Sequence, residues 1–199
     1  MTDKKLILSL FDFTGAWSKP YREAGYDVIQ VDIKLGIDIL EWDYKAITRP
    51  VHGILNATPC TAYSLSGTRW WAEKDSNGTT DVFDRLTRKG LEIINYFKPK
   101  WWVLENPIGR IDKRIPELKP YRRMEFDPCD FGDPYTKRTR LWGEFSPFLI
   151  RTPVPPTEGS KMHLLPPGPD RARLRSATPE GFSRAVFEAN HRGQLRLLG

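Results

Sequence analysis

The sequence predicts a doubly wound α/β fold with a mostly parallel sheet, and three features of the chain support this prediction. Four short apolar runs alternate with segments of helical periodicity, the pattern of strands joined by helices. Glycine and proline stand between these segments, where the chain must turn. The chain has 199 residues, of which 39% are hydrophobic, so we expect one globular domain over residues 1–199 with a single main core.

The predicted strands are short runs of apolar residues. Residues 5–11 (KLILSLF) fit a buried strand, and residues 27–33 (DVIQVDI), 52–56 (HGILN) and 101–104 (WWVL) repeat the signal. In a doubly wound sheet the carboxyl ends of the parallel strands lie at one edge, and ligands bind there. We therefore expect the functional residues in the loops that follow these four runs.

The predicted helices lie between and after these strands. Ser18 and Pro20 indicate a helix start soon after the first strand, because serine caps a helix and proline suits its first turn. Residues 178–190 predict a closing helix that docks on the sheet, and residues 144–178, rich in proline and arginine, predict mostly loop. Residues 81–97 predict an amphipathic helix. Its apolar face comprises Val82, Phe83, Leu86, Ile93, Ile94 and Phe97.

The formal net charge of +6 is unevenly distributed along the chain. Residues 1–107 contain 14 basic and 14 acidic residues, whereas residues 108–199 contain 17 basic and 11 acidic ones, so the second half carries the whole excess. This asymmetry points to a polyanionic partner that is met by the second half. A solvated basic surface without such a partner is the alternative.

Several classes of protein are excluded by the composition. No run of about 18 apolar residues is present, and Asp12 breaks the apolar stretch near the N-terminus, so we expect no membrane span, no signal peptide and a cytoplasmic location. Cys60 and Cys129 are too few for a disulfide framework. Because the three histidines lie far apart in the sequence, no zinc motif is formed and we expect no metal.

Two segments, which follow the first and the second predicted strands, indicate a ligand-binding site. Residues 9–18 (SLFDFTGAWS) contain small residues that let the backbone approach a ligand, although such a glycine turn is often structural only. Asp32 ends the second predicted strand, where doubly wound folds place an acid that accepts hydrogen bonds from ribose hydroxyls. Asp38 follows in residues 36–39 (GIDI). An exposed cap is the alternative for either aspartate.

Three further segments carry reactive or charged groups. Cys60 lies in residues 58–64 (TPCTAYS), after the third predicted strand, and a buried structural cysteine is the alternative. Cys129 has no comparable surroundings and is expected to be structural. Glu105 lies in residues 104–107 (LENP), where a buried carboxylate needs either an arginine partner or a ligand. Residues 131–140 (FGDPYTKRTR) are basic, with a solvated hairpin as the alternative.

In this order, these segments resemble the motifs of the cytosine-C5 DNA methyltransferase family over residues 6 to about 143, with a weaker likeness at 178–190. The resemblance implies a Rossmann-like methyltransferase fold and S-adenosylmethionine as the cofactor. The sequence departs from the family pattern at Ser9, Phe13 and Tyr135, and one extra residue precedes Arg138. The residues that the resemblance places around the cofactor are Phe11, Thr14, Gly15, Ala16, Trp17, Asp32, Ile33, Asp38, Ile39 and Pro59.

The resemblance also implies a mechanism on cytosine in double-stranded DNA. Cys60 would attack ring C6, Glu105 would hold N3 and the exocyclic amino group, and Arg140, with Arg138 beside it, would bind O2 and favour the Cys60 thiolate. Because C6 is out of reach in a stacked duplex, the target base must be flipped out. The residues expected to contact DNA are Ser64, Arg69, Trp70, Arg138, Arg171, Arg173 and Arg175.

The number of residues after the last motif indicates how many base pairs of DNA the protein recognises. Only 56 residues follow Gly143, which is short for the family's large target-recognition domain plus the closing helix. We therefore expect a monomer similar to small phage or prophage methylases that reads about two to four base pairs, such as GC. Trp70 and Trp71 would fill the vacated base stack or, alternatively, belong to the core. The alternatives for function are an RNA (tRNA) cytosine methyltransferase and a non-catalytic DNA-binding accessory protein.

Overall fold

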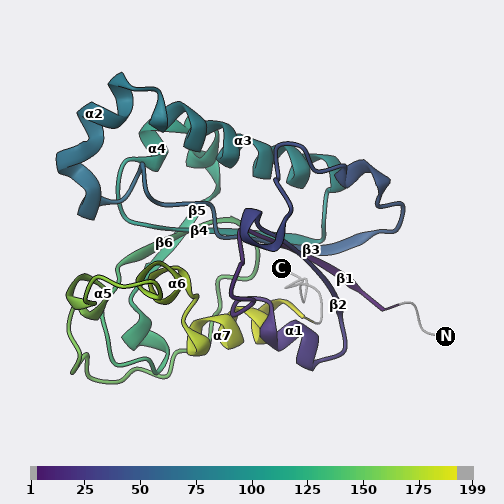
Figure 1. Cartoon of the computed structure of the whole chain (residues 1–199). Coiled ribbons are helices and arrows are strands. Elements are labelled where there is room, and N and C mark those ends of the chain that lie inside the picture. Colours follow the sequence, from purple (N-terminus) through teal and green to yellow (C-terminus); the bar gives the residue numbers. More distant parts are fainter. Residues whose placement is uncertain (1–3, 192–199) are drawn as a thin grey trace.

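The computed structural model describes residues 4–191, in which a six-stranded sheet lies between two layers of helices (Figure 1). The strand order is β2-β1-β3-β4-β6-β5. The first four strands are parallel, while β6 is antiparallel to both β4 and β5. The predicted α/β class with a mostly parallel sheet is therefore confirmed. The strands are β1 (Leu6–Leu10), β2 (Asp27–Val31), β3 (Val51–Asn56), β4 (Trp101–Pro107), β5 (Arg122–Phe126) and β6 (Thr139–Glu144).

Helices cover both faces of the sheet. In Figure 1, α2, α3 and α4 lie over one face, while α1 and α7 lie over the other. The helices predicted at 81–97 and 178–190 correspond to α3 and α7, and Ser18 and Pro20 stand at the start of α1 as predicted. The segment expected to be mostly loop contains two short helices. The helices are α1 (Lys19–Glu23), α2 (Trp71–Ser76), α3 (Thr79–Phe97), α4 (Ile111–Arg114), α5 (Lys161–Leu164), α6 (Arg171–Ser176) and α7 (Glu180–Asn190).

The sequence pattern does not predict β5 and β6, which extend the sheet beyond β4. β5 is an edge strand, and charged side chains at Arg122, Arg123 and Glu125 obscure the alternation that marks a strand. Two of these side chains find partners on the neighbouring strand: Oε1 of Glu125 lies 2.6 Å from Nη2 of Arg140, and Nε of Arg123 donates to the Gly143 carbonyl at 2.8 Å. This end of the sheet is therefore held in part by ion pairs.

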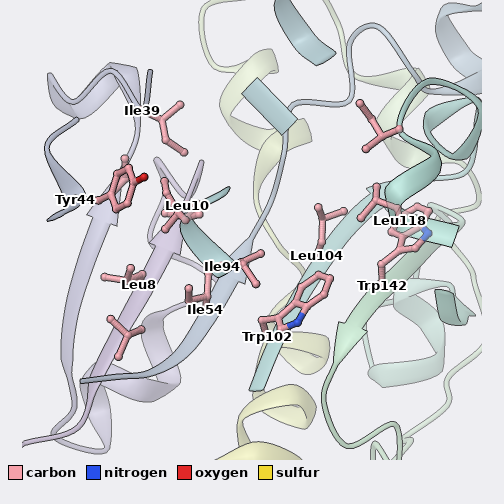
Figure 2. Close-up of a cluster of buried hydrophobic side chains, with 14 of the residues drawn as sticks. Leu8, Leu10, Ile39, Tyr44, Ile54, Ile94, Trp102, Leu104, Leu118 and Trp142 are labelled. Atoms are coloured by element: carbon pink, nitrogen blue, oxygen red, sulfur yellow. The ribbon is translucent and has the colours of Figure 1, made fainter. Parts of the chain in front are cut away.

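Two hydrophobic clusters, one on each face of the sheet, form the core. All of β1 is buried, and its side chains alternate between the clusters: Leu8 and Leu10 belong to the one under α3, and Ile7 to the other. Figure 2 shows the first cluster, where Ile94 of α3 lies near Ile54 of β3. Because β1 is covered on both faces, its place in the fold requires a continuous apolar run.

The helix α3 joins the core at one end and a cavity at the other. Ile93 and Ile94, near its C-terminus, are buried in the first cluster, as predicted from their spacing. Val82, in the first turns, is 41% exposed and lines a cavity together with Leu86. The apolar face of α3 is therefore longer than the core it covers, and its N-terminal part belongs to the site described next.

Candidate active site

A cavity of about 1170 Å³ opens at the carboxyl ends of the four parallel strands. Its wall contains residues from the loops after β1, β2, β3 and β4, the edge where a doubly wound sheet binds its ligands. Residues 136–138, just before β6, and four residues between 160 and 176 form another part of the wall. Lys74, Val82, Leu86 and Asp127 also line it. Pockets for drug-sized ligands measure about 300–1,000 Å³, so this cavity has room for more than one small ligand.

The loop after β1 is shaped by a buried carboxylate. Oδ2 of Asp12 accepts hydrogen bonds from Oγ of Ser9 and Oγ of Ser18, both at 2.8 Å, and from the Ser18 backbone N at 3.1 Å. Gly15 has a φ of 65°, and a Cβ there would lie 2.5 Å from Nη2 of Arg22. That nitrogen donates to the Gly15 carbonyl at 2.6 Å. The positive φ therefore favours glycine at position 15, and the absence of a Cβ leaves room for Arg22.

The side chains that reach the cavity from this loop are aromatic. Phe11 and Phe13 line the wall, and Phe11 has a φ of 60°, a left-handed conformation that is costly for a residue with a bulky side chain. The Phe11 backbone N donates to the Val31 carbonyl at 2.7 Å, which ties the loop to the end of β2. Nζ of Lys34 lies 4.9 Å from the centroid of the Phe13 ring. Phe13, a departure from the family pattern, is thus a wall residue that sequence reasoning missed.

Only part of the set expected around the cofactor lines the cavity. Trp17 is fully buried and packs against Phe182 of α7, with ring centroids 6.0 Å apart. Oγ1 of Thr14 accepts a hydrogen bond from the Ala16 backbone N at 3.2 Å, so these residues turn the loop. Thr14, Gly15, Ala16 and Trp17 do not line the cavity, whereas Phe11, Asp32, Ile33, Asp38, Ile39 and Pro59 do.

Asp32 and Asp38 each present an acceptor to the cavity. Oδ1 of Asp32 accepts a hydrogen bond from the Lys34 backbone N, and Oδ1 of Asp38 from the Leu40 backbone N, both at 2.9 Å. Within the described part of the chain, the second oxygen of each carboxylate has no hydrogen-bond partner. Each aspartate therefore caps a turn with one oxygen and leaves the other without a partner among the described residues.

Cys60 lies in the cavity wall, in the loop after β3. Its carbonyl accepts hydrogen bonds from the backbone N of Tyr63 and of Ser64, both at 2.9 Å. Asn106, near the end of β4, donates from Nδ2 to the Thr58 carbonyl at 2.8 Å. These bonds fix the loop on both sides of the thiol, so Cys60 is held at the ligand edge of the sheet.

Charged groups around Cys60 act on it in opposite directions. Burial raises the pKa of the Cys60 thiol, Lys137 lowers it, Glu105 raises it and Arg175 lowers it. Burial also raises the pKa of Glu105, and Lys137 lowers that pKa too. Within residues 4–191, no hydrogen bond or ion pair engages the Glu105 carboxylate, which does not itself line the cavity. Cys60, Glu105 and Lys137 therefore form one electrostatically coupled group, the Cys60 cluster.

The two arginines of the basic motif have different surroundings. Arg138 lines the cavity, with its side chain 48% exposed, and Nη1 lies 3.2 Å from Oδ2 of Asp127. Arg140 does not line the cavity. Its Nε donates to Glu125 at 2.8 Å, and its Nη1 donates to Asp112 at 2.7 Å, the same acid that accepts from Nε1 of Trp142. The structure brings Arg138 to the cavity and holds Arg140 away from it.

The loop after Cys60 contributes one of its predicted DNA-contact residues to the wall. Ser64 lines the cavity, whereas Arg69 and Trp70 do not. The Trp70 side chain is 47% exposed, with the Arg69 guanidinium 5.0 Å from its ring centroid. Trp70 is therefore not a core residue. Trp71 is partly buried, with the Arg110 guanidinium 4.6 Å from its ring.

The three arginines of α6 also differ in placement. Arg175 lines the cavity, and its carbonyl accepts a hydrogen bond from Nζ of Lys137 at 3.1 Å. Arg173 is exposed and pairs with Asp170 at 2.9 Å. Arg171 is partly buried and does not line the cavity. Of the three, only Arg175 is placed in the cavity wall.

Neither Cys129 nor a group of metal ligands forms a further site in the described part of the chain. Cys129 does not line the cavity, and burial together with Asp130 and Asp127 raises the pKa of its thiol. Within residues 4–191, no group of three or more His, Cys, Asp or Glu is placed to hold a metal ion. In the same part of the chain, no helix has the length and apolar character needed to cross a membrane.

Comparison with solved structures identifies the class of fold. A DNA modification methyltransferase encoded within a prophage (E. coli) is similar to this chain, with a TM-score of 0.50 and 16% sequence identity. The match covers 75% of this chain and 49% of the other, so this chain spans about half the length of that protein. The likeness shows that the fold is that of a methyltransferase. No family model matches the sequence.

Comparison with known sequences gives the family. The "Probable DNA (cytosine-5)-methyltransferase" of Frog virus 3 (isolate Goorha) is 31% identical to this chain over 162 residues, and the match covers 73% of this chain and 73% of that protein. The chain therefore belongs to the DNA (cytosine-5)-methyltransferase family. The resemblance noted from the ordered motifs is thus confirmed.

Proposed function

We propose that this chain methylates C5 of cytosine in DNA, with S-adenosylmethionine as methyl donor and Cys60 as covalent nucleophile. One observation carries the proposal: a single cavity wall holds the Cys60 thiol, coupled to Glu105, and the carboxylates of Asp32 and Asp38. A thiol and two carboxylates suited to the hydroxyl and amino groups of a nucleoside thus share one space. The family of the chain supports cytosine and DNA as the target.

The wall residues fit S-adenosylmethionine. Asp32 and Asp38 each keep one carboxylate oxygen for the hydroxyl or amino groups of an adenosine. Phe11 and Ile39 offer apolar surface for its flat ring system. When bound, this cofactor supplies a methyl group on a positively charged sulfur.

The Cys60 cluster would activate the cytosine ring, because C5 alone is a poor nucleophile. Addition of the Cys60 sulfur to C6 forms an S–C6 bond and breaks the C5=C6 π bond, pushing negative charge into the ring. Burial raises the pKa of Glu105, so its protonated form is available to give a proton to N3 as that charge develops. C5 would then take the methyl group, while the bond from that carbon to the donor sulfur breaks and the sulfur is left as a neutral thioether.

The adduct must break down to release the product. C5 loses its proton to a base, the S–C6 bond breaks and the C5=C6 double bond re-forms. Cys60 leaves as a thiolate, and the proton on N3 returns to Glu105. This sequence of steps leaves 5-methylcytosine and restores both side chains, so the chain needs no other covalent group.

The geometry requires an extruded base. Cys60 stands in the wall of a cavity, and a base within a duplex presents only its edges, so the target cytosine must leave the stack. The exposed Trp70, with Arg69 over its ring, lies in the loop after Cys60 and is suited to meet the opened duplex. We propose that few bases are read beyond the target, about two to four pairs.

The proposal is tested by bisulfite sequencing of plasmid DNA from cells that lack cytosine methylation and express the protein. We expect 5-methylcytosine at a short site with the wild type and with Cys129→Ala, and none with Cys60→Ala. Methylation confined to a site of six or more base pairs would contradict the short site. Methylation of cellular RNA but not of plasmid DNA would move the activity to the RNA alternative, and methylation that survives Cys60→Ala would overturn the mechanism.

A further inference from the structure

The motif arginine expected at the target base points to the wrong face of the sheet. Arg140 of β6 lies opposite Asn106 of β4, and Trp142, two residues further, belongs to the cluster under α3. Glu105 lies opposite Leu141, which belongs to the cluster on the other face. Because side chains alternate along a strand, Arg140 and Glu105 point to opposite faces. In this structure the two side chains therefore do not meet, and Arg140 pairs instead with Glu125 and Asp112.

Lys137 stands where Arg140 was expected. It lines the cavity, and it acts on both Cys60 and Glu105, lowering the pKa of each. Two hydrogen bonds fix it: its backbone N donates to Oδ1 of Asp127 at 2.9 Å, and its Nζ donates to the Arg175 carbonyl at 3.1 Å. The ammonium is therefore held between β6 and α6, in the cavity wall.

The other cations near the cluster are less suited to this place. Arg138 lines the cavity but is committed to Asp127 and to Glu125, at 3.2 and 3.4 Å. Arg175 lowers the pKa of Cys60, but this effect is smaller than the effects of Lys137 and Glu105 on the same pKa. Arg175 does not shift the pKa of Glu105. Lys137 is the cation that couples to both reactive side chains in the described residues.

We propose that Lys137 is the active-site cation that faces the target base, beside Cys60 and Glu105. The inference rests on the proposed function, since it places a cytosine in the cavity. An ammonium has three N–H donors, and the Arg175 carbonyl takes one, which leaves two for a ligand. When Cys60 adds to C6, negative charge spreads through N3 to the carbonyl oxygen O2. A fixed ammonium there stabilises that charge without reorganisation.

Lys137 also acts before the base arrives. A positive charge beside a thiol favours the thiolate, so loss of the ammonium must move the Cys60 titration to higher pH. The charged groups that face Cys60 are Lys137, Glu105 and Arg175, and Tyr135 is coupled to Glu105. Loss of Lys137 also raises the pKa of Glu105, and a neutral Glu105 no longer repels the thiolate. The net shift is therefore smaller than the lysine charge alone would give.

The first test is the pH dependence of Cys60 alkylation by iodoacetamide, in the full chain with Cys129→Ala as background. We expect Lys137→Met to raise the midpoint of the pH profile by about one pH unit, which makes alkylation at neutral pH roughly tenfold slower. The midpoint of Lys137→Arg should stay close to that of the parent protein. Lys74→Met is the matched control, because Lys74 also lines the wall and its Nζ donates to a backbone carbonyl, that of Thr61 at 2.7 Å. An unchanged midpoint in Lys137→Met, or an equal shift in Lys74→Met, overturns the proposal.

The second test addresses the base-facing role through methyl transfer to a cytosine-containing duplex. Lys137→Met should lower kcat by roughly 10²–10³, with a much smaller change in KM for DNA, and Lys137→Arg should recover part of the loss. Circular dichroism checks folding, and Lys137→Gln replaces the Met variant if that one does not fold. An unchanged kcat overturns the proposal. If the wild type methylates nothing, the proposed function fails, while the alkylation profile still decides whether Lys137 controls the thiol.

Discussion

The two parts of the cavity wall are held by different forces. The loops after β1 and β3 are fixed by buried hydrogen bonds, such as those from Ser9 and Ser18 to Asp12 and from Asn106 to the Thr58 carbonyl. The part formed by residues 136–138 and α6 carries charged side chains, several of them in solvent-exposed ion pairs. Salt screens exposed pairs but hardly affects buried hydrogen bonds. The first part is thus preorganised, and the second responds to ionic strength and to a polyanion.

The largest effect should come from substitution of Glu105, the carboxylate of the Cys60 cluster. We expect Glu105→Gln to lower turnover by about two to four orders of magnitude, because the amide cannot donate a proton to N3 and take it back. Binding of S-adenosylmethionine, measured by calorimetry, should not change. Glutamine keeps the size of the side chain and removes a buried ionisable group, so the melting temperature should not fall. Unchanged turnover would make Glu105 a structural residue.

A smaller effect is expected at the preorganised part of the wall. Asp32→Ala removes the acceptor proposed for the ribose hydroxyls and should weaken S-adenosylmethionine binding by about 10- to 100-fold, the range for a hydrogen bond to a charged group. Turnover at saturating cofactor should recover. Asp43→Ala is the control, because Asp43 is an exposed acid outside the wall. Equal cofactor affinity in both variants and the wild type would refute the role of Asp32.

The smallest effect is expected from the charged part of the wall. Neutralising the arginines of α6 together (R171Q, R173Q and R175Q) should weaken DNA binding and flatten its salt dependence, with the slope of log K against log salt smaller by up to about three. Cofactor binding should stay intact. Fluorescence anisotropy with a labelled duplex at several salt concentrations measures the slope.

A matched control neutralises three cations at the opposite edge of the sheet. Lys5 precedes β1, and Lys98 and Lys100 precede β4, so all three lie away from the carboxyl ends of these strands. Their replacement by glutamine changes the net charge by the same amount. If the control flattens the salt dependence as much as the α6 variant does, DNA binding follows the overall charge and not the wall.

The parallel half of the fold could be predicted because its signals are local. Buried strands such as β1 are continuous apolar runs, and the loops after them contain Asp32, Cys60 and Glu105 within a few residues of the strand ends. The exception is the tip of the first loop. Thr14 to Trp17 lie within six residues of Phe11 in the sequence, but hydrogen bonds of Asp12 and Arg22 turn them away from the cavity. No periodic pattern in the sequence predicts those hydrogen bonds.

The antiparallel strands β5 and β6 could not be predicted, because their geometry depends on strand register. A shift of one residue reverses the face of a side chain, so the position of Arg140 in a motif does not tell which way it points. Its partner Asp112 comes from α4, distant in sequence. Lys137 next to two arginines is typical of a basic surface, and only the approach of α6 and β4 places it in the Cys60 cluster.

The central claim is that Cys60 forms a covalent bond with the target base. The direct measurement is mass spectrometry of the protein after incubation with S-adenosylmethionine and a duplex that carries 5-fluorocytosine at the methylated site, because fluorine at C5 blocks the final elimination. We predict an adduct on the peptide that contains Cys60, formed by the wild type and by Cys129→Ala and absent in Cys60→Ala. An adduct that persists in Cys60→Ala, or that maps to Cys129, would contradict the claim.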